Sequence, residues 1–335
     1  MNYQIKLTQP DPALDGRHLE ELIDLWLEDV AQSATPSTAA GYRQKTDHFV
    51  HWWREEGPPA DWQITRRKLG EFGRRLAKTP QKKTGRPASY NQQNDVIRRL
   101  RQMFRWSYER GYTAIDHGPW LPTPQGEPPK RTAASLADLG RLLDAAGQSS
   151  HPERDRALLA VLIGTGARRA EAATIQIEHI QIAADGSGTA AITGKRTKAN
   201  KDGRRQIAFD RATGRYIADL LDLDQRTAGA LFIQDDGRPM GLQAVHRAVK
   251  RAIQRAGLED KITGAHDLRR AFATHLARQA NAGGDSTLSA DLIRRQMGHT
   301  SYGMTGHYTL IDVDDIRETL RSPLAMMEAA GSVTA

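Results

Sequence analysis

A tyrosine and a histidine near the C-terminus stand at a spacing that could do nucleophilic chemistry. In QMGHTSYGMTGHYTL, residues 296–310, His299 precedes Tyr308 by nine residues, with three glycines around them. A stretch with three glycines is a poor helix and can approach another backbone closely. A phenol becomes a nucleophile once a base takes its proton. Tyr302 and His307 compete for these two roles, and a surface loop with a packed aromatic ring is the alternative.

Two further motifs pair an arginine with a second polar residue at helical spacing. In GTGARRAE, residues 164–171, Arg168 follows a glycine-bounded turn and Glu171 lies one helical turn later. In AHDLRRAFATHL, residues 265–276, His266 and Arg269 are three residues apart. Guanidinium groups suit phosphate oxygens. Taken singly, the first motif also fits a surface salt bridge, and the second a capping histidine beside an exposed arginine.

A basic loop completes this set. The stretch GKRTKANKDGRR, residues 194–205, lies between two predicted strands and contains Lys195 and Lys198. It is either a basic finger that reaches a polyanion or a solvated loop. A lysine on a mobile loop could give a proton to a departing oxygen.

Together these motifs resemble the tyrosine recombinase (phage integrase) family. The chain contains, in this order, R-x-x-E after T-G, H-x-x-R, G-H and a tyrosine nine residues later. This order and spacing are those of the family. The resemblance covers the C-terminal part closely and the N-terminal part loosely. It is to the simple Xer/Cre-like form without an arm-binding domain, since residues 1–17 are too few for one.

The resemblance implies a role for each matching residue. Tyr308 is the nucleophile, and Arg168 and Arg269 grip the scissile phosphate. His266 and His299 are the active-site histidines. Glu171 supports the first arginine. Lys195 is the catalytic lysine with Lys198 as its competitor, because the loop is longer than the G-K-x-x-K-x-R form. Ala167 stands where the family usually has leucine, which changes packing only.

The implied reaction is a metal-independent transesterification without a cofactor. The enzyme would cut duplex DNA through a 3′-phosphotyrosyl intermediate and exchange strands between two sites. The implied partners are double-stranded DNA with a short inverted-repeat target and three further copies of the chain, in a tetramer on two DNA sites. Accessory proteins are left open. The alternatives are a type IB topoisomerase-like or telomere-resolvase activity, and a catalytically silent DNA-binding regulator.

The N-terminal part is predicted to be a small helical unit. Apolar residues recur at helical spacing from residue 18, from Ser37 (the expected N-cap) to 55, over 65–77 and over 89–110. The fourth of these helices carries side chains suited to phosphates and base edges. The predicted DNA contacts are Arg98, Arg99, Arg101, Arg105, Asn91 and Gln92. A solvated basic face is the alternative.

The C-terminal part is predicted to be mostly helical with one small sheet. Ser135 with Asp138 indicates a capping box, and a helix follows at 153–164. Alternating residues predict strands at 179–183, 189–194 and 204–209. Helices are expected at 211–223, 241–256, 266–281 and 286–297. An apolar tail after residue 320 either packs on its own domain or docks on a neighbouring subunit, and the second reading is favoured.

The expected fold is therefore mainly α. An N-terminal helical core-binding (SAM-like) domain precedes a C-terminal mixed α/β catalytic domain with a three-stranded antiparallel sheet. We expect an arm at 1–17, the core DNA-binding domain at 18–112, a linker at 113–132 and the catalytic domain with its tail at 133–335. Five prolines and two glycines between 113 and 132 indicate the linker.

Composition agrees with a basic, nucleic-acid-binding protein. The 335 residues hold 48 Lys and Arg against 40 Asp and Glu, and no cysteine. Disulfides, cysteine-bound zinc and thiol catalysis are thereby excluded. Neither a signal peptide nor a membrane-length apolar run is seen, so a cytoplasmic protein with no membrane partner is expected.

Overall fold

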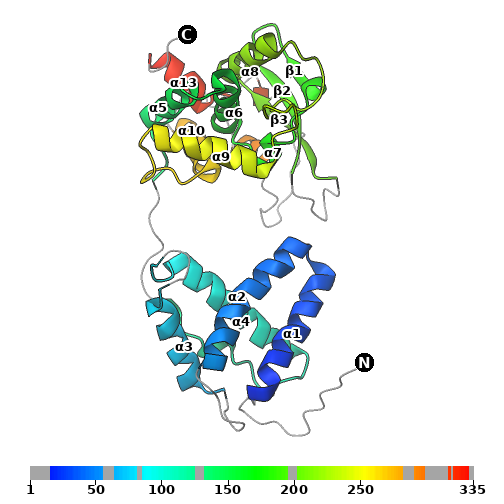
Figure 1. Cartoon of the computed structure of the whole chain (residues 1–335), viewed down its shortest axis with the longest axis vertical. Helices are drawn as coiled ribbons and strands as arrows, with labels where there is room; N and C mark the ends of the chain where they lie inside the picture. Colours follow the sequence, from blue (N-terminus) through cyan, green and yellow to red (C-terminus); the bar gives the residue numbers. More distant parts are fainter. Residues whose placement is uncertain are drawn as a thin grey trace. The chain divides into compact units, whose positions relative to one another are not determined.

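The computed structural model describes residues 16–55, 64–80, 85–124, 132–194, 202–281, 290–298, 316–317 and 320–331. The chain divides into two compact units, Met1–Arg131 and Thr132–Ala335 (Figure 1). All six tryptophans of the sequence belong to the first unit.

The first unit is a bundle of helices around an aromatic core. Its elements are α1 (Gly16–Ser33), α2 (Pro36–Glu55), α3 (Arg66–Lys78), α4 (Tyr90–Glu109) and the short 3-10 helix η1 (Gly118–Trp120). Phe49 of α2 is fully buried. Its ring meets Phe72 of α3 edge to face at 4.9 Å between centroids, and Phe104 of α4 at 6.2 Å. These contacts hold α2, α3 and α4 together.

Side-chain caps fix where α4 and α2 begin. Ser89 accepts a hydrogen bond from the backbone N–H of Gln92, whose side chain accepts one from the Ser89 N–H. The predicted cap Ser37 is wrong, because α2 begins one residue earlier, at Pro36. The Thr35 hydroxyl accepts from the Thr38 N–H at 3.3 Å, and proline suits the first helical position because it has no N–H to satisfy.

The second unit contains the remaining elements. They are α5 (Leu136–Gly147), α6 (Pro152–Thr165), α7 (Arg169–Ala172), η2 (Ile177–His179), β1 (Ile180–Ile182), β2 (Gly188–Thr193), β3 (Arg204–Phe209), α8 (Arg211–Asp224), α9 (Leu242–Arg255), α10 (Ala265–Asn281), α11 (Ala290–Met297) and α13 (Pro323–Ala329). The predicted capping box at the start of α5 is confirmed. The predicted fold class, mainly helical with a small antiparallel sheet, is confirmed as well.

Helix α6 is the centre of this unit. It contacts α5, α8, α9, α10, α13 and β3, and every residue from Ala157 to Thr165 is buried. Its segment ALLAVLIG, residues 157–164, is apolar all round, as expected of a stretch with no solvent face. The turn that begins at Gly166, directly after α6, therefore starts from a fixed position in the core.

The three strands form one antiparallel sheet in the order β1-β2-β3. Ile192 of β2 lies opposite Arg205 of β3, and Ala190 lies opposite Ile207. The first strand is shorter than predicted. Between β2 and β3, the Gly194 N–H donates to the Gly203 carbonyl at 2.7 Å, which closes the ladder at the foot of the predicted basic loop.

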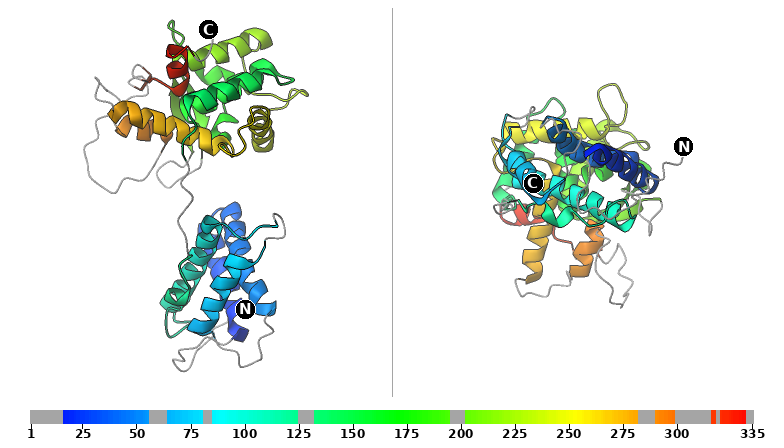
Figure 2. Two further views of the ribbon diagram at one scale, coloured as in Figure 1. Left: turned by 90° about the vertical axis from the view of Figure 1, so that its left-hand side faces the viewer. Right: turned by 90° about the horizontal axis from the view of Figure 1, so that it is seen from below.

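Two helix arrangements matter for the site and the tail. Helices α10 and α11 lie side by side (Figure 2). Helix α13 packs on α5, α6, α8 and α10 of its own unit, with Leu324 and Met327 buried (Figure 1). Packing of the tail on its own domain, the alternative expectation, is thus seen in this chain, and docking on a neighbouring subunit stays a prediction. These apolar side chains find their partners within the same chain.

Candidate active site in the second unit

A glycine turn presents Arg168 at the end of the central helix. Gly166 caps α6 in the left-handed conformation, with φ of 65°. A Cβ atom at this position would lie 2.4 Å from the ring of Phe272, so only glycine fits. The Thr165 hydroxyl accepts from the Ala167 N–H at 3.1 Å and fixes the turn. Arg168 therefore leaves the core at a defined point.

Glu171 is the anchor of the site. Its carboxylate is 1% exposed and accepts hydrogen bonds from Arg168, at 2.7 Å from the backbone N–H and 2.8 Å from Nη1. Arg205 of β3 also donates to it, at 3.3 Å from Nε and 3.0 Å from Nη2. The predicted support of Arg168 by Glu171 is thus present in the geometry, but a second arginine shares the carboxylate.

Arg269 lies deeper in the same cluster. Its side chain is 4% exposed, and its Nη1 is 3.9 Å from a Glu171 oxygen. Nη1 donates to the Gly166 carbonyl at 2.6 Å, and Nη2 donates to the Met297 carbonyl. These carbonyls stand at the C-terminal ends of α6 and α11, where a cation is favourable because the helix dipoles are negative there.

The charges of this cluster shift two pKa values. Burial raises the pKa of Glu171, but the charge of Arg205 and hydrogen bonds from Arg168 and Arg205 outweigh it, so the net pKa is lowered. Burial, with the charge of Arg168 next, lowers the pKa of Arg269 to about 10, although Glu171 opposes this. Three guanidinium groups thus surround one carboxylate.

The cluster has the electrostatics of an anion site. One ionised carboxylate among three arginines leaves two positive charges unneutralised within it. Arg168, with 42% of its side chain exposed, is the arginine best placed to meet a ligand from solvent. A phosphate group, which takes forked hydrogen bonds from guanidinium donors, fits this charge and geometry.

The other predicted site residues divide into two groups. His266 is exposed on the first turn of α10, three residues before Arg269. Tyr308, His299, Lys195 and Lys198 lie outside the described residues, as do the rivals Tyr302 and His307.

Lys195 and His299 each follow a described residue, Gly194 and Gly298, and both of these glycines lie at the cluster. Gly194, which precedes Lys195, approaches so closely that an added Cβ would be 2.8 Å from a Glu171 oxygen. The carbonyl of Gly298, which precedes His299, accepts from Arg168 Nη2 at 3.4 Å.

Sequence reasoning missed Arg205 and Gln296. Arg205 is two and four residues before Ile207 and Phe209, which are buried, so the three side chains share one face of the sheet. A charged side chain on the inner face of a sheet needs a buried partner. That signal was available in the sequence. Gln296 is buried and bonds Thr165 and Ala208, residues 131 and 88 positions away, for which no local pattern exists.

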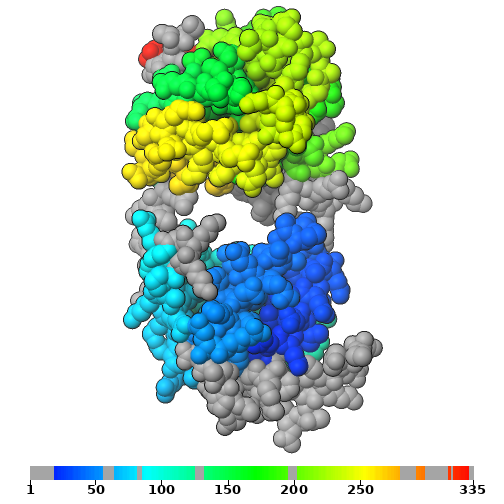
Figure 3. Space-filling model, viewed as in Figure 1, coloured from blue at the N-terminus to red at the C-terminus, as the bar shows by residue number. Residues whose placement is uncertain are grey.

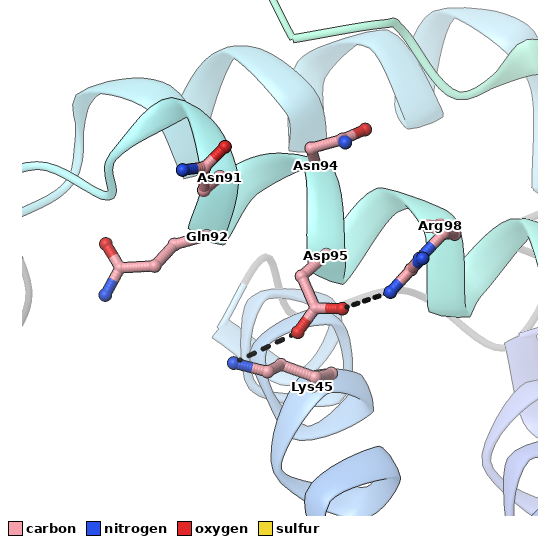
Figure 4. Close-up of a pocket in the computed structure, with 6 residues that line it drawn as sticks. All are labelled: Lys45, Asn91, Gln92, Asn94, Asp95 and Arg98. Atoms are coloured by element: carbon pink, nitrogen blue, oxygen red, sulfur yellow. Dashed lines mark hydrogen bonds and ion pairs between the residues drawn. The ribbon is translucent and has the colours of Figure 1, made fainter. Parts of the chain in front are cut away.

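The predicted DNA-contact helix carries a polar hollow on the first unit. Its volume is about 360 Å³, and its lining residues are Lys45, Asn91, Gln92, Asn94, Asp95 and Arg98. Figure 4 shows Asp95 between two cations, 3.6 Å from Lys45 Nζ and 3.1 Å from an Arg98 nitrogen. Amide and guanidinium groups at the rim can donate to and accept from base edges.

The structure separates the four predicted arginines of α4. Arg98 and Arg105 are exposed. Arg99 instead stacks on the Tyr42 ring at 4.1 Å and donates to its hydroxyl at 2.7 Å. Arg101 donates to the Leu121 carbonyl at 2.8 Å. The last two are occupied with internal contacts of the first unit, because they lie on the sides of the helix that face α2 and the segment after η1.

Helix α9 adds a basic face that the sequence analysis did not single out. Its buried side faces the core, and its exposed side carries Arg247, Lys250, Arg251 and Arg255. No acidic residue occurs on this helix. Figure 3 shows α9, in yellow, along the visible face of the second unit. A stripe of this kind is one feature by which nucleic-acid-binding surfaces are recognised.

Two features are absent from the described residues. Within these ranges, no three histidine or acidic side chains gather as a metal site would require. No helix in the described part of the chain is long and apolar enough to span a membrane.

Comparison with known proteins places this site in a family context. The model of the "Phage integrase family" matches residues 135–314. The tyrosine recombinase XerD of Corynebacterium glutamicum is 26% identical over 311 residues, covering 90% of this chain and 96% of that protein. The XerD of Ralstonia nicotianae is 27% identical over 324 residues, covering 94% and 95%.

Solved structures share the fold. A lambda integrase fragment, residues 75–356, bound as a dimer to a COC′ core site matches with a TM-score of 0.62 and 16% identity, covering 88% of this chain and 99% of that one. A lambda integrase tetramer bound to a Holliday junction matches with a TM-score of 0.63 and 16% identity, covering 84% and 77%.

Proposed function

Because the chain belongs to the phage integrase family, we propose that it is a site-specific DNA recombinase that works through a tyrosine–DNA intermediate. The observation that carries the proposal is the cluster of Arg168, Glu171 and Arg269 within the family match. It offers a positive, partly exposed site at the foot of the segment that holds Tyr308.

The proposed first step is attack on one phosphodiester bond. The Tyr308 oxygen bonds to phosphorus while the bond from phosphorus to the 5′-oxygen breaks. A histidine, His299 or His266, takes the phenol proton, and Lys195, with Lys198 as its competitor, gives a proton to the departing 5′-oxygen. The products are a 3′-phosphotyrosine and a free 5′-hydroxyl. A 5′-hydroxyl from a second site reverses the step, so strands are exchanged without hydrolysis.

The two predicted phosphate arginines would contribute differently. Arg168 is exposed enough to donate directly to a nonbridging oxygen. Arg269 is buried with both terminal nitrogens on carbonyls, so in this conformation it contributes mainly charge. Charge stabilisation by fixed cations strengthens as negative charge builds up on the phosphate. The arginines thereby supply what a metal ion supplies in other phosphoryl-transfer sites, and we propose that the reaction proceeds in chelator without a cofactor.

DNA would be held by both units. On the first, Asn91, Gln92, Arg98 and Arg105 are the proposed contacts, and on the second, the basic face of α9. We further propose a homotetramer on two short inverted-repeat sites, supported by the shared fold with an integrase tetramer on a Holliday junction. Action on DNA inside the cell implies a cytoplasmic protein. Accessory proteins stay open.

Adduct trapping tests the proposal. The protein is incubated with sheared genomic DNA from its source in chelator and stopped with detergent. Protein-bound DNA is then recovered and its ends sequenced, with Tyr308→Phe in parallel. A Tyr308-dependent adduct at one sequence with a free 5′-hydroxyl is expected. Scattered adducts would instead indicate a topoisomerase-like enzyme. DNA binding with no adduct from the wild type would indicate a silent regulator and contradict the proposal.

A further inference from the structure

Arg205 belongs to the same cluster and has no role in the reaction as proposed above. We propose that Arg205, paired with Glu171, is a positioning residue that holds Gly194 and Gly298, the described residues just before Lys195 and His299, at the cluster. This inference rests on the proposed function and concerns how the site is assembled. Arg205 comes from β3, Glu171 from α7, and the two glycines directly follow β2 and α11.

Arg205 is committed to the protein rather than to a ligand. Its Nε and Nη2 form a fork on the Glu171 carboxylate at 3.3 and 3.0 Å. Its Nη1 donates to the Gln296 carbonyl at 2.7 Å. Only 17% of its side chain is exposed, against 42% for Arg168. With all three nitrogens engaged, Arg205 holds groups in place and leaves the phosphate to its neighbours.

The two glycines approach this pair closely. A Cβ atom on Gly194 would lie 2.8 Å from Glu171 Oε1. A Cβ atom on Gly298, where φ is 61°, would lie 2.8 Å from Arg205 Nε. Each partner of the ion pair is thus in contact with the residue just before a predicted catalytic side chain. A displacement of either partner moves one of these glycines.

Gln296 ties the end of α11 to the same place. Its side-chain nitrogen donates to the carbonyls of Thr165 and Ala208 at 3.1 and 2.8 Å, and its side-chain oxygen accepts from the Ala208 N–H at 3.1 Å. Because Arg205 also donates to the backbone carbonyl of Gln296, Gln296 is held to α6 and β3 at once. The last turn before His299 is therefore set by the sheet as well as by helix packing.

The pair also sets the charge balance. The groups that face Glu171 are Arg168 at the start of α7, Arg205 on β3 and Arg269 on α10. Burial favours the neutral form of Glu171, whereas nearby cations favour its ionised form. Without Arg205 fewer cations remain, so the pKa of Glu171 rises. A protonated Glu171 would hold Arg168 less firmly. Cleavage by an Arg205 variant should then weaken on acidification at a higher pH than cleavage by the wild type.

The test is single-turnover cleavage by the full chain. The substrate is a nicked duplex carrying the sequence recovered by adduct trapping, built to lose a short fragment so that religation stops. The variants are Arg205→Met and Arg205→Lys. Gln206→Met, at an exposed position of the same strand, is the control. The rate constant for adduct formation, the Kd for the same DNA and the pH profile of the rate are measured.

The expected result is a rate constant lower by roughly 10- to 100-fold in Arg205→Met than in the wild type. The Kd should stay within about twofold of the wild-type value. The pH at which the rate falls on acidification should be higher than in the wild type. Arg205→Lys should recover only part of the rate, because an ammonium cannot reproduce the fork and reach Gln296 together. In a Glu171→Gln background, Arg205→Met should add little. Gln206→Met should behave as the wild type does.

Each other outcome decides against the inference. Adduct formation by the wild type with an unchanged rate and pH profile in Arg205→Met would overturn it while leaving the recombinase proposal intact. If Arg205→Met does not fold, an unchanged rate in Arg205→Lys would overturn it equally. No adduct from the wild type would remove the proposed function and this inference with it.

Discussion

At the scale of single residues, the two predicted phosphate arginines differ in what they do for the fold. Arg168 is partly exposed, whereas Arg269 is buried and bonds the carbonyls that end α6 and α11. Loss of Arg269 leaves those two buried carbonyls without a donor, and each such group costs about 1–3 kcal/mol. The same substitution at Arg168 removes one donor from Glu171, which keeps Arg205 and the Arg168 backbone N–H, and one bond to the partly exposed Gly298 carbonyl.

We therefore expect Arg269→Met to lower the free energy of unfolding of the second unit by about 2–4 kcal/mol. Arg168→Met should lower it by less than half as much, although both variants lose cleavage. Thermal denaturation followed by far-UV circular dichroism checks this. Equal stability loss in the two variants would contradict the assignment of Arg269 as a helix-end clamp.

Glu171 should make the second unit sensitive to acid. Its pKa in the folded chain is lower than the ordinary value of 4.5. A group of this kind adds stability that is fully present above the unfolded pKa and is lost as the pH falls through the folded pKa. The wild type should thus lose stability as the pH falls below about 4.5.

Glu171→Gln should be less stable than the wild type at pH 7 and should lose less on acidification. Melting temperatures between pH 7 and pH 3.5 give the two slopes, and Glu259→Gln, an exposed carboxylate, serves as control. Parallel slopes for the wild type and Glu171→Gln would show that this carboxylate does not titrate differently in the two states.

At the scale of elements, α13 is part of the core of its own unit. Ser322 caps it, and the Ser322 N–H donates to a buried Asp210 oxygen at 2.8 Å. Met327 is fully buried, while Met326 on the same helix is half-buried. The two methionines form a matched pair for measuring how much the tail stabilises the unit.

Met327→Ala should cost about 2–4 kcal/mol, and Met326→Ala less than half of that. Circular dichroism follows both units, whereas tryptophan fluorescence follows only the first, because all six tryptophans lie there. The dichroism transition of Met327→Ala should therefore shift without a shift in fluorescence. Equal small effects of both substitutions would indicate that α13 is only loosely held.

At the scale of the whole molecule, binding should depend steeply on salt. A net charge of +8 and the basic stripe on α9 favour phosphate contacts, and each one adds about 0.9 to the slope of log K against log salt. Replacing Arg247 and Arg251 by Gln should lower that slope by about 2 and weaken binding to all DNA sequences alike.

Titrations at several salt concentrations, with specific and unrelated duplexes, measure this slope. The control is a double variant, Glu153→Gln with Glu259→Gln, which changes two charges outside α9. It should not lower the slope. If the α9 variant kept the wild-type slope, its stripe would be a solvated face and the DNA path would lie elsewhere.

The sequence predicted local features well and long-range ones poorly. Helix and strand positions follow from periodicity and from caps such as Ser135, which depend on residues a few positions apart. The cap of α2 was misplaced by two residues, because Thr35 precedes a proline and Ser37 stands just inside the helix. The roles of Arg205 and Gln296 depend on partners 34 to 131 residues away, and pairing over that range is set by how α6, β3 and α11 pack.

The position of Arg269 affects how related sequences should be interpreted. A descendant that stopped cutting DNA but kept its shape would still need a cation between the ends of α6 and α11. Selection for folding alone would then preserve this arginine long after selection for chemistry had ceased. Its presence in a relative is accordingly a poor marker of activity. The partly exposed Arg168, whose one carbonyl partner is itself partly exposed, should be among the first to drift in a lineage that has become a pseudoenzyme.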